Sequence, residues 1–225
     1  MPFIGNTPAA VPLTSADIAD SIITSAKIVD GTIVNADINA SAAIASTKLS
    51  GVTSDYVLLS TTTASGTATT VDITSNINST YSIYRLSFFN LSAAGAGNTI
   101  FLRISDDAGA TFKSTNYKHT GLSMNYTGAA ITRNDEAATG FVIISTNLPN
   151  YNDSATEGAC GFIEFYNPSV SRKAVFTGMT AQIDDAGDAD IFYLGGVYTT
   201  AIIFNAVRIA ASNNIYGTFK LYGIK

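Results

Sequence analysis

Residues 14–49 read TSADIADSIITSAKIVDGTIVNADINASAAIASTKL. An isoleucine occupies every fifth position in the first part of this stretch, and the spacing resumes after one extra residue. The positions are Ile18, Ile23, Ile28, Ile33, Ile38, Ile44 and Leu49. A period of five fits neither an α-helix, with a period of 3.6, nor a β-strand, with a period of 2. The spacing therefore predicts a repeat architecture, in which each unit is too small to bury its own apolar side chain.

Two repeat architectures would shield these side chains. One is a single chain wound into a β-solenoid, but about seven units give fewer than two four-sided coils, below the roughly three repeats that such folds need. The other is several identical chains wound around a common axis, and we expect this one, as a closed three-fold stalk. The remaining alternative is a linker rich in alanine, serine and threonine.

The rest of the chain divides around this stretch. Residues 1–13 contain three of the five prolines, which keep a segment extended, and Phe3 and Ile4 are large apolar side chains within it. We expect residues 1–13 to anchor the chain on a partner through Phe3 and Ile4; a frayed terminus is the alternative. The predicted stalk covers residues 14–54, and residues 55–225 are enough for one domain with a sizeable core.

Composition excludes several classes of partner. Only 13% of the residues are charged, against roughly 25% in average soluble domains. The net charge of −5 disfavours nucleic acid and anionic membranes, and no run of residues is apolar and long enough to insert into a bilayer. The one cysteine, Cys160, rules out a disulfide framework within the chain. We also expect no export signal, because residues 1–13 lack a basic residue and an apolar run.

From Tyr56 onward, alternating apolar and polar residues between Gly, Asn and Asp turns predict short strands. We place them near residues 56–60, 67–74, 81–90, 98–105, 111–118, 139–147, 160–167, 172–183, 190–199, 202–210 and 215–224. Ile100, Leu102 and Ile104 form one apolar stripe, and Phe219 and Leu221 form another in the last strand. The sequence thus predicts an all-β fold, an extended repeat stalk followed by an antiparallel β-sandwich of jelly-roll type.

Residues 105–112 read SDDAGATF and match the pattern Ser-x-Asp-x-Gly-x-Thr-aromatic. The pattern is similar to the Asp-box hairpin of sialidase propellers, where it is structural and remote from catalysis. We expect a structural hairpin here, in which carboxylate and hydroxyl groups bond turn backbone, the glycine takes positive φ and the aromatic ring packs beneath. The residues concerned are Ser105, Asp107, Gly109, Thr111 and Phe112. One copy does not imply a propeller.

An acidic cluster surrounds Gly187. It consists of Asp184, Asp185, Asp188 and Asp190. Closely spaced oxygen ligands suit calcium, but the spacing is not that of an EF-hand loop, and we favour a solvated turn between two strands because aspartate and glycine are common in turns. One histidine, His119, and one cysteine are too few for a zinc site. We expect no metal site and no cofactor.

Nothing in the sequence marks a catalytic group. No Gly-x-Ser-x-Gly elbow is present. A glycosidase needs a pair of carboxylates, and the acidic residues include Glu136, Glu157 and Glu164, but no pattern distinguishes any of them. The prediction is therefore a protein that is not an enzyme.

Tyrosine is the most unusual residue by count, with eleven copies and no tryptophan. Tyr117, Tyr126 and Tyr151 lie near loops rich in asparagine and glycine. Tyrosine is enriched in contact surfaces, so these three are candidates for contact with a carbohydrate or a protein. The alternative is a core position with the hydroxyl in water.

Three stretches carry a family resemblance: MPFIGNTP at residues 1–8, IVDGTIVNADI at 28–38 and GTFKLYGI at 217–224. Together they resemble tailed-bacteriophage fibre and virion-decoration proteins. The resemblance implies a homotrimer on the outer surface of the virion, assembled in the host cytoplasm. Its N-terminus would contact other virion proteins, and its C-terminal knob would face outward.

The resemblance leaves the location and role open. The first interpretation is a tail fibre or spike whose knob adsorbs to a glycan or protein of the host surface. The second is a head fibre or capsid decoration protein docked by its N-terminus, which the short chain suits equally well. A polysaccharide-degrading tailspike is the third, and it requires a carboxylate pair in a groove.

Overall fold

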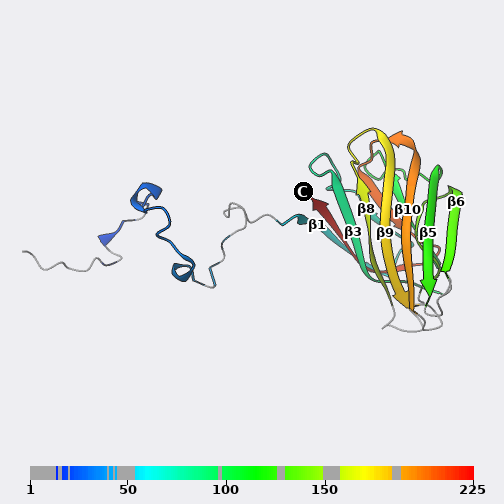
Figure 1. Cartoon of the computed structure of the whole chain (residues 1–225), viewed down its shortest axis with the longest axis horizontal. Helices are drawn as coiled ribbons and strands as arrows, with labels where there is room; N and C mark the ends of the chain where they lie inside the picture. The colour runs from blue at the N-terminus through cyan, green and yellow to red at the C-terminus, as the bar shows by residue number, and fades with distance from the viewer. Residues whose placement is uncertain are drawn as a thin grey trace, which may run out of the picture. The chain divides into compact units, whose positions relative to one another are not determined.

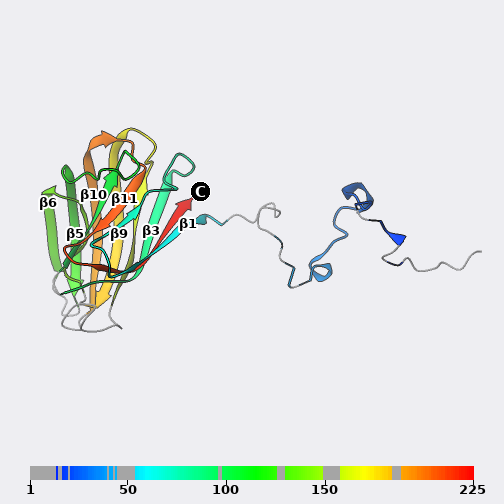
Figure 2. The same cartoon turned by 180° about the vertical axis from the view of Figure 1, so that it is seen from behind.

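The structure of the chain is a computed structural model, drawn in Figure 1 and from behind in Figure 2. It describes residues 14, 17–19, 21–39, 41–42, 44, 54–95, 98–125, 130–148, 158–183 and 189–225. Within these ranges it describes every side chain except those of residues 35, 125, 130–138 and 145–148. Contacts between residues divide the chain into two compact units, Met1–Thr53 and Ser54–Lys225. None of the described residues lies in a helix long and apolar enough to cross a membrane.

The described part of the N-terminal unit is a series of tight turns with the same period as the isoleucines. In each turn a backbone N–H donates to the carbonyl oxygen three residues earlier. The accepting carbonyls belong to Thr14, Ala19, Thr24, Val29, Val34 and Asn39, with N···O distances of 2.8 to 3.4 Å. Two of these turns form short 3₁₀ helices, η2 (Ser25–Lys27) and η3 (Asn35–Asp37). From Ile18 to Ile38, each isoleucine directly follows the residue that donates.

Polar side chains close some of these turns. The Asp17 carboxylate accepts hydrogen bonds from the Thr14 backbone N–H at 2.8 Å and from the Thr14 hydroxyl at 2.6 Å, and these bonds lower the pKa of Asp17. Asp37 accepts from the Val34 N–H at 2.9 Å across the same three-residue interval. Aspartate and asparagine favour such turns because their side chains bond nearby backbone. This accounts for short polar residues between the isoleucines.

The C-terminal unit is all-β. Its described residues form β1 (Tyr56–Ser65), β2 (Thr70–Ile73), β3 (Ile83–Ala93), β4 (Asn98–Ser105), β5 (Tyr117–Asn125), β6 (Ala130–Ala138), β7 (Phe141–Leu148), β8 (Ala159–Tyr166), β9 (Arg172–Ile183), β10 (Ala189–Ile202), β11 (Ala206–Ala210) and β12 (Ile215–Ile224). An eight-stranded sheet has the order β1-β12-β3-β8-β9-β10-β5-β6, and a four-stranded sheet has the order β2-β11-β4-β7. The pairs are antiparallel, which confirms the predicted all-β, antiparallel class.

Eight of the strands pair in a nested order. β1 pairs with β12, β2 with β11, β3 with β8, and β4 with β7. The other four strands form two hairpins, β5–β6 and β9–β10, which widen the larger sheet beyond β8. We call β9, β10, β5 and β6 the extension; Figure 1 shows these strands side by side. The extension packs over β7 of the smaller sheet. Another strand of the smaller sheet, β11, is labelled in Figure 2.

The core lies between the two sheets. The predicted stripe of Ile100, Leu102 and Ile104 on β4 is fully buried, and so are Phe219 and Leu221 on β12. Both stripes face the opposite sheet because alternate residues of a strand point to the same side. β12 lies between β1 and β3, so the last strand is paired on both sides.

One strand prediction is wrong over most of its length, and one strand was not predicted. Residues 111–116 form no strand, and β5 begins only at Tyr117. The reason is that β4 belongs to one sheet and β5 to the other, so the intervening loop crosses between sheets and has no continuous partner. β6 was not predicted at all, because its sequence AITRNDEAA shows no apolar alternation.

Candidate functional site

The repeat isoleucines form a row of exposed apolar side chains. From Ile18 to Ile44 they are 40% to 54% exposed, and no described residue of the N-terminal unit belongs to the hydrophobic core. Complete burial of an isoleucine is worth about 1.5–3 kcal/mol. An assembly in which another surface covers these isoleucines would therefore be stabilised relative to the single chain.

Several predicted site residues lie outside the described residues. They are Phe3, Ile4, Leu49, Tyr126, Tyr151, Asp184, Asp185 and Asp188. The predicted anchor, the end of the predicted stalk core and most of the acidic cluster therefore remain sequence-based predictions.

Residues 105–112 form a compact hydrogen-bonded turn between β4 and the loop that leads to β5. The Ser105 hydroxyl donates to Asp107 Oδ1 at 2.6 Å and accepts from the Gly109 N–H at 3.0 Å. Thr111 donates its N–H to Asp107 Oδ1 at 2.9 Å and its hydroxyl to Oδ2 at 2.5 Å. Gly109 has a φ of 91°. The predicted partners therefore meet, but as a crossing between sheets and not as a hairpin of paired strands.

Charge and packing support this turn from outside. The hydrogen bonds from Ser105 and Thr111 hold the pKa of Asp107 well below its usual range. Asn205 accepts the Ala108 N–H at 2.9 Å, which ties the turn to the loop before β11. The Arg208 guanidinium lies 4.1 Å from the centre of the Phe112 ring. The bonds to the backbone N–H groups of Ala108, Gly109 and Thr111 order the turn, as expected of a structural turn.

The prediction that Tyr117 belongs to a contact surface is wrong. Its side chain is fully buried, and its ring centre lies 5.1 Å from that of Tyr198. The Tyr117 hydroxyl accepts a hydrogen bond from the Ile104 N–H at 2.9 Å. Burial raises the pKa of the Tyr117 phenol. Tyr117 is the first residue of β5 and points inward, which joins the extension to β4.

The outward face of the larger sheet carries a surface that the sequence did not reveal. On β8, β9, β10 and β5, neighbouring outward positions are apolar across the strands, and we call this set the apolar strip. It comprises Leu122, Met124, Cys160, Phe162, Met179, Ala181, Ile191 and Tyr193. The next outward row along the strands is polar and contains Glu164, Thr177 and Thr120. The available signal was the run IFYL at 191–194, because a strand that is apolar on both faces shows no alternation.

A polar network borders the apolar strip. Arg85 on β3 donates to Glu164 on β8, with Nε–Oε1 at 2.9 Å and Nη2–Oε1 at 2.5 Å. The Tyr166 hydroxyl donates to the second carboxylate oxygen of Glu164 at 2.9 Å. The Arg85 guanidinium also lies 4.1 Å from the centre of the Phe162 ring. The charges of Arg85 and Glu164 offset one another.

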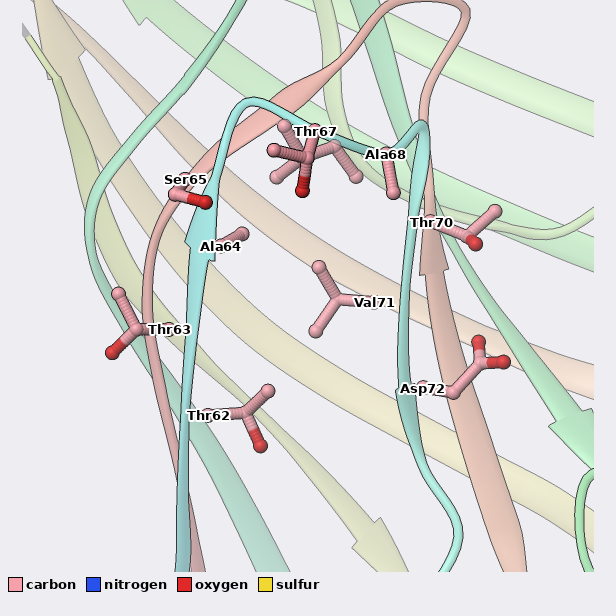
Figure 3. Close-up of a pocket in the computed structure, with 10 residues that line it drawn as sticks. Thr62, Thr63, Ala64, Ser65, Thr67, Ala68, Thr70, Val71 and Asp72 are labelled. Atoms are coloured by element: carbon pink, nitrogen blue, oxygen red, sulfur yellow. The ribbon is translucent and has the colours of Figure 1, made fainter.

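A shallow hollow of about 210 Å³ lies at one side of the sandwich, between β1 and β2. These are the edge strands of the two sheets. Figure 3 shows Ala64 and Val71 facing each other across it, with Thr62 on the same side of β1 as Ala64, whereas Thr70 and Asp72 lie on the other side of β2. Asp72, the one acidic residue of the lining, is paired with Arg208 at 2.6 Å. The hollow thus offers small apolar groups and hydroxyls, and its one carboxylate is held in an ion pair.

Comparisons with known proteins add no relative. No protein-family model, no curated protein and no solved structure matches the chain. The candidate surfaces must therefore be judged on their own geometry.

The described residues contain no group of three or more His, Cys, Asp or Glu side chains that would hold a metal ion. Of the three glutamates considered from sequence, Glu164 lies in the network with Arg85, whereas the side chains of Glu136 and Glu157 are not described. What the described geometry offers is contact: a row of isoleucines, an apolar sheet face and a hydroxyl-lined hollow.

Proposed function

We propose that this chain is one subunit of a homotrimeric stalk-and-knob protein on the outer surface of a tailed-phage virion. In this proposal residues 14–54 form the stalk and residues 55–225 form a knob that contacts the host surface. The observation that carries the proposal is the coincidence of two five-residue periods. One is the period of the isoleucines, and the other is the period of the backbone turns before them.

The coincidence matters because it makes successive units alike. Like turns present like side chains at regular intervals, so a second chain of the same sequence meets the same pattern throughout the contact. In a flexible linker, nothing requires the backbone hydrogen bonds to recur with the same period as the apolar residues. A closed ring of copies also leaves no unpaired row, whereas an open arrangement would continue to add chains.

The nested strand pairing supports a jelly-roll knob. Two Greek keys wound together pair the first strand with the last, the second with the next to last, and so inward. The pairs β1–β12, β2–β11, β3–β8 and β4–β7 have this order once the two hairpins of the extension are set aside. Such a knob is a rigid support for contact surfaces and requires no cofactor.

The virion location rests on the resemblance of residues 1–8, 28–38 and 217–224 to phage fibre and decoration proteins. It is favoured by the low charge and by the absence of any recognised catalytic pattern. Residues 1–13, with Phe3 and Ile4, are the proposed attachment to other virion proteins.

Sedimentation equilibrium of the full chain tests the trimer. We expect three times the mass of the 23.5 kDa subunit; a well-folded single subunit at micromolar concentration would overturn the proposal.

Immunogold labelling of virions and competition with phage adsorption test the location and the role. Label at the tail with competition supports the fibre. Dense label on the head without competition assigns a capsid decoration protein, and loss of host polysaccharide on incubation assigns a depolymerising tailspike.

A further inference from the structure

Exposure of large apolar side chains is unevenly distributed over the C-terminal unit. Among its described residues, the exposed large apolar side chains that lie in strands all belong to the larger sheet. Six of them are on the extension: Leu122, Met124, Val175, Ile183, Ile191 and Tyr193. The described strand residues of the smaller sheet include no exposed large apolar side chain. An apolar area that gathers on one face of one sheet is a candidate contact surface.

The charge pattern points to the nature of the partner. Each chain carries a net charge of −5, so copies repel one another unless the surfaces that meet lack acidic groups. The apolar strip contains no charged residue, and its nearest ion pair, Arg85–Glu164, is neutral overall. The outward face of the smaller sheet instead carries Arg103 and the Arg208–Asp72 pair. On the same outward face Lys118 and Lys173 lie near Val175, beyond the polar row, so the apolar strip itself presents no acidic group to a like copy.

We propose that the apolar strip is covered by neighbouring copies of the same chain, so that knobs pack against each other through the extension. This inference rests on the proposed trimer, because the same chain already carries a second apolar row, the repeat isoleucines, that calls for sister copies. If copies of the chain cover both the apolar strip and the isoleucine row, a single assembly buries both exposed apolar surfaces.

The size of the strip determines how it acts. Four neighbouring strands span about 15 Å, and the two outward positions Ile191 and Tyr193 cover about 13 Å of β10, which makes a flat area of about 200 Å². A stable complex buries roughly 800 Å² per partner, so the strip is too small to hold free subunits together. Chains joined through a stalk are held at millimolar effective concentration, and a weak contact then closes. Knob contact therefore depends on the stalk, whereas the stalk does not depend on knob contact.

Cys160 is a native probe of this surface. It is the only cysteine in the sequence, it is exposed in the single chain, and it pairs in register with Ala181 inside the apolar strip. A thiol reagent such as 5,5′-dithiobis(2-nitrobenzoate) reacts with Cys160 only when the strip is uncovered. In the assembled full chain we expect labelling at least about tenfold slower than in urea-dissociated, still folded subunits, since labelling follows the open population.

Two substitutions separate the strip from the stalk. We expect Leu122→Asp and Tyr193→Asp to restore fast Cys160 labelling while sedimentation still gives the trimer. The matched control is Thr99→Asp, which introduces the same acidic group on the outward side of β4 in the smaller sheet. We expect Cys160 labelling in this variant to stay slow. Circular dichroism and urea midpoints check that each variant is folded.

Three results would overturn the inference. A wild-type trimer whose Cys160 reacts as fast as in dissociated subunits leaves the proposed stalk intact but shows that copies do not cover the strip. Slow labelling that appears only when host cells are added assigns the strip to the host surface. A single subunit in sedimentation overturns both the inference and the proposed trimer.

Discussion

Replacing Ile23 and Ile33 by alanine tests whether the isoleucine row holds copies together. Both side chains are 54% exposed in the single chain. About half of the 1.5–3 kcal/mol for complete burial is then available between chains, or about 1 kcal/mol per side chain. Two substitutions in each of three copies remove about 6 kcal/mol, which lowers the association constant by about four orders of magnitude. Sedimentation equilibrium over a dilution series measures this constant directly.

Val29→Ala with Val34→Ala is the matched control. These valines are also exposed, but each lies one residue after an isoleucine and so is not one of the repeat isoleucines. We expect this pair to change the association constant by no more than about tenfold. Equal weakening by the two pairs would show that general stickiness, and not the pattern, brings the copies together. That result would refute the reasoning even if a trimer were found.

Three further predictions concern the C-terminal unit. The pKa of Asp107 is lowered, so its hydrogen bonds stabilise the fold at pH values above the unfolded-state pKa near 4, and this stabilisation is lost as the pH falls. Below about pH 4, the urea midpoints of the wild type should therefore decline more steeply than those of Asp107→Asn. Leu86→Ala should lower the free energy of unfolding by about 2–5 kcal/mol because the Leu86 side chain is fully buried on β3. Leu58→Ala should cost far less because the Leu58 side chain on β1 is exposed, and a similar loss for both would contradict the described core. Tyr117→Phe leaves the buried Ile104 N–H without its acceptor, and urea denaturation should show a loss of about 1–3 kcal/mol; no loss would mean that water replaces the hydroxyl.

Features that depend on near neighbours were predictable from the sequence. The alternation around Leu102 placed β4, and the pattern of Phe219 and Leu221 placed β12, because one face of each strand is apolar and the other is not. The residues of the turn at 105–112 were also predictable, because Asp107 bonds groups within four residues of itself.

Features that depend on distant partners were not predictable. The segment that begins at Thr111 has strand-like residues, but it crosses from one sheet to the other. Its Lys113 N–H donates to the Ile104 carbonyl oxygen at 2.9 Å, yet residues 111–116 form no strand. β6 has few apolar residues and becomes a strand because β5 offers it an edge. Tyr117 was assigned to the surface from its loop-rich surroundings, whereas the packing of β5 against β4 buries it.

The sequence by itself determined the five-residue period, the strand-rich class and the chemistry of the Asp107 turn, because each arises from spacing and bonding within a few residues. Only the tertiary structure decided the nested pairing of β1 with β12 and the addition of two hairpins to one sheet. It also decided which apolar residues remain uncovered. The physical reason is that Tyr193 and Phe192 are both apolar, and a single strand cannot distinguish its buried face from its exposed one until another sheet covers one of them.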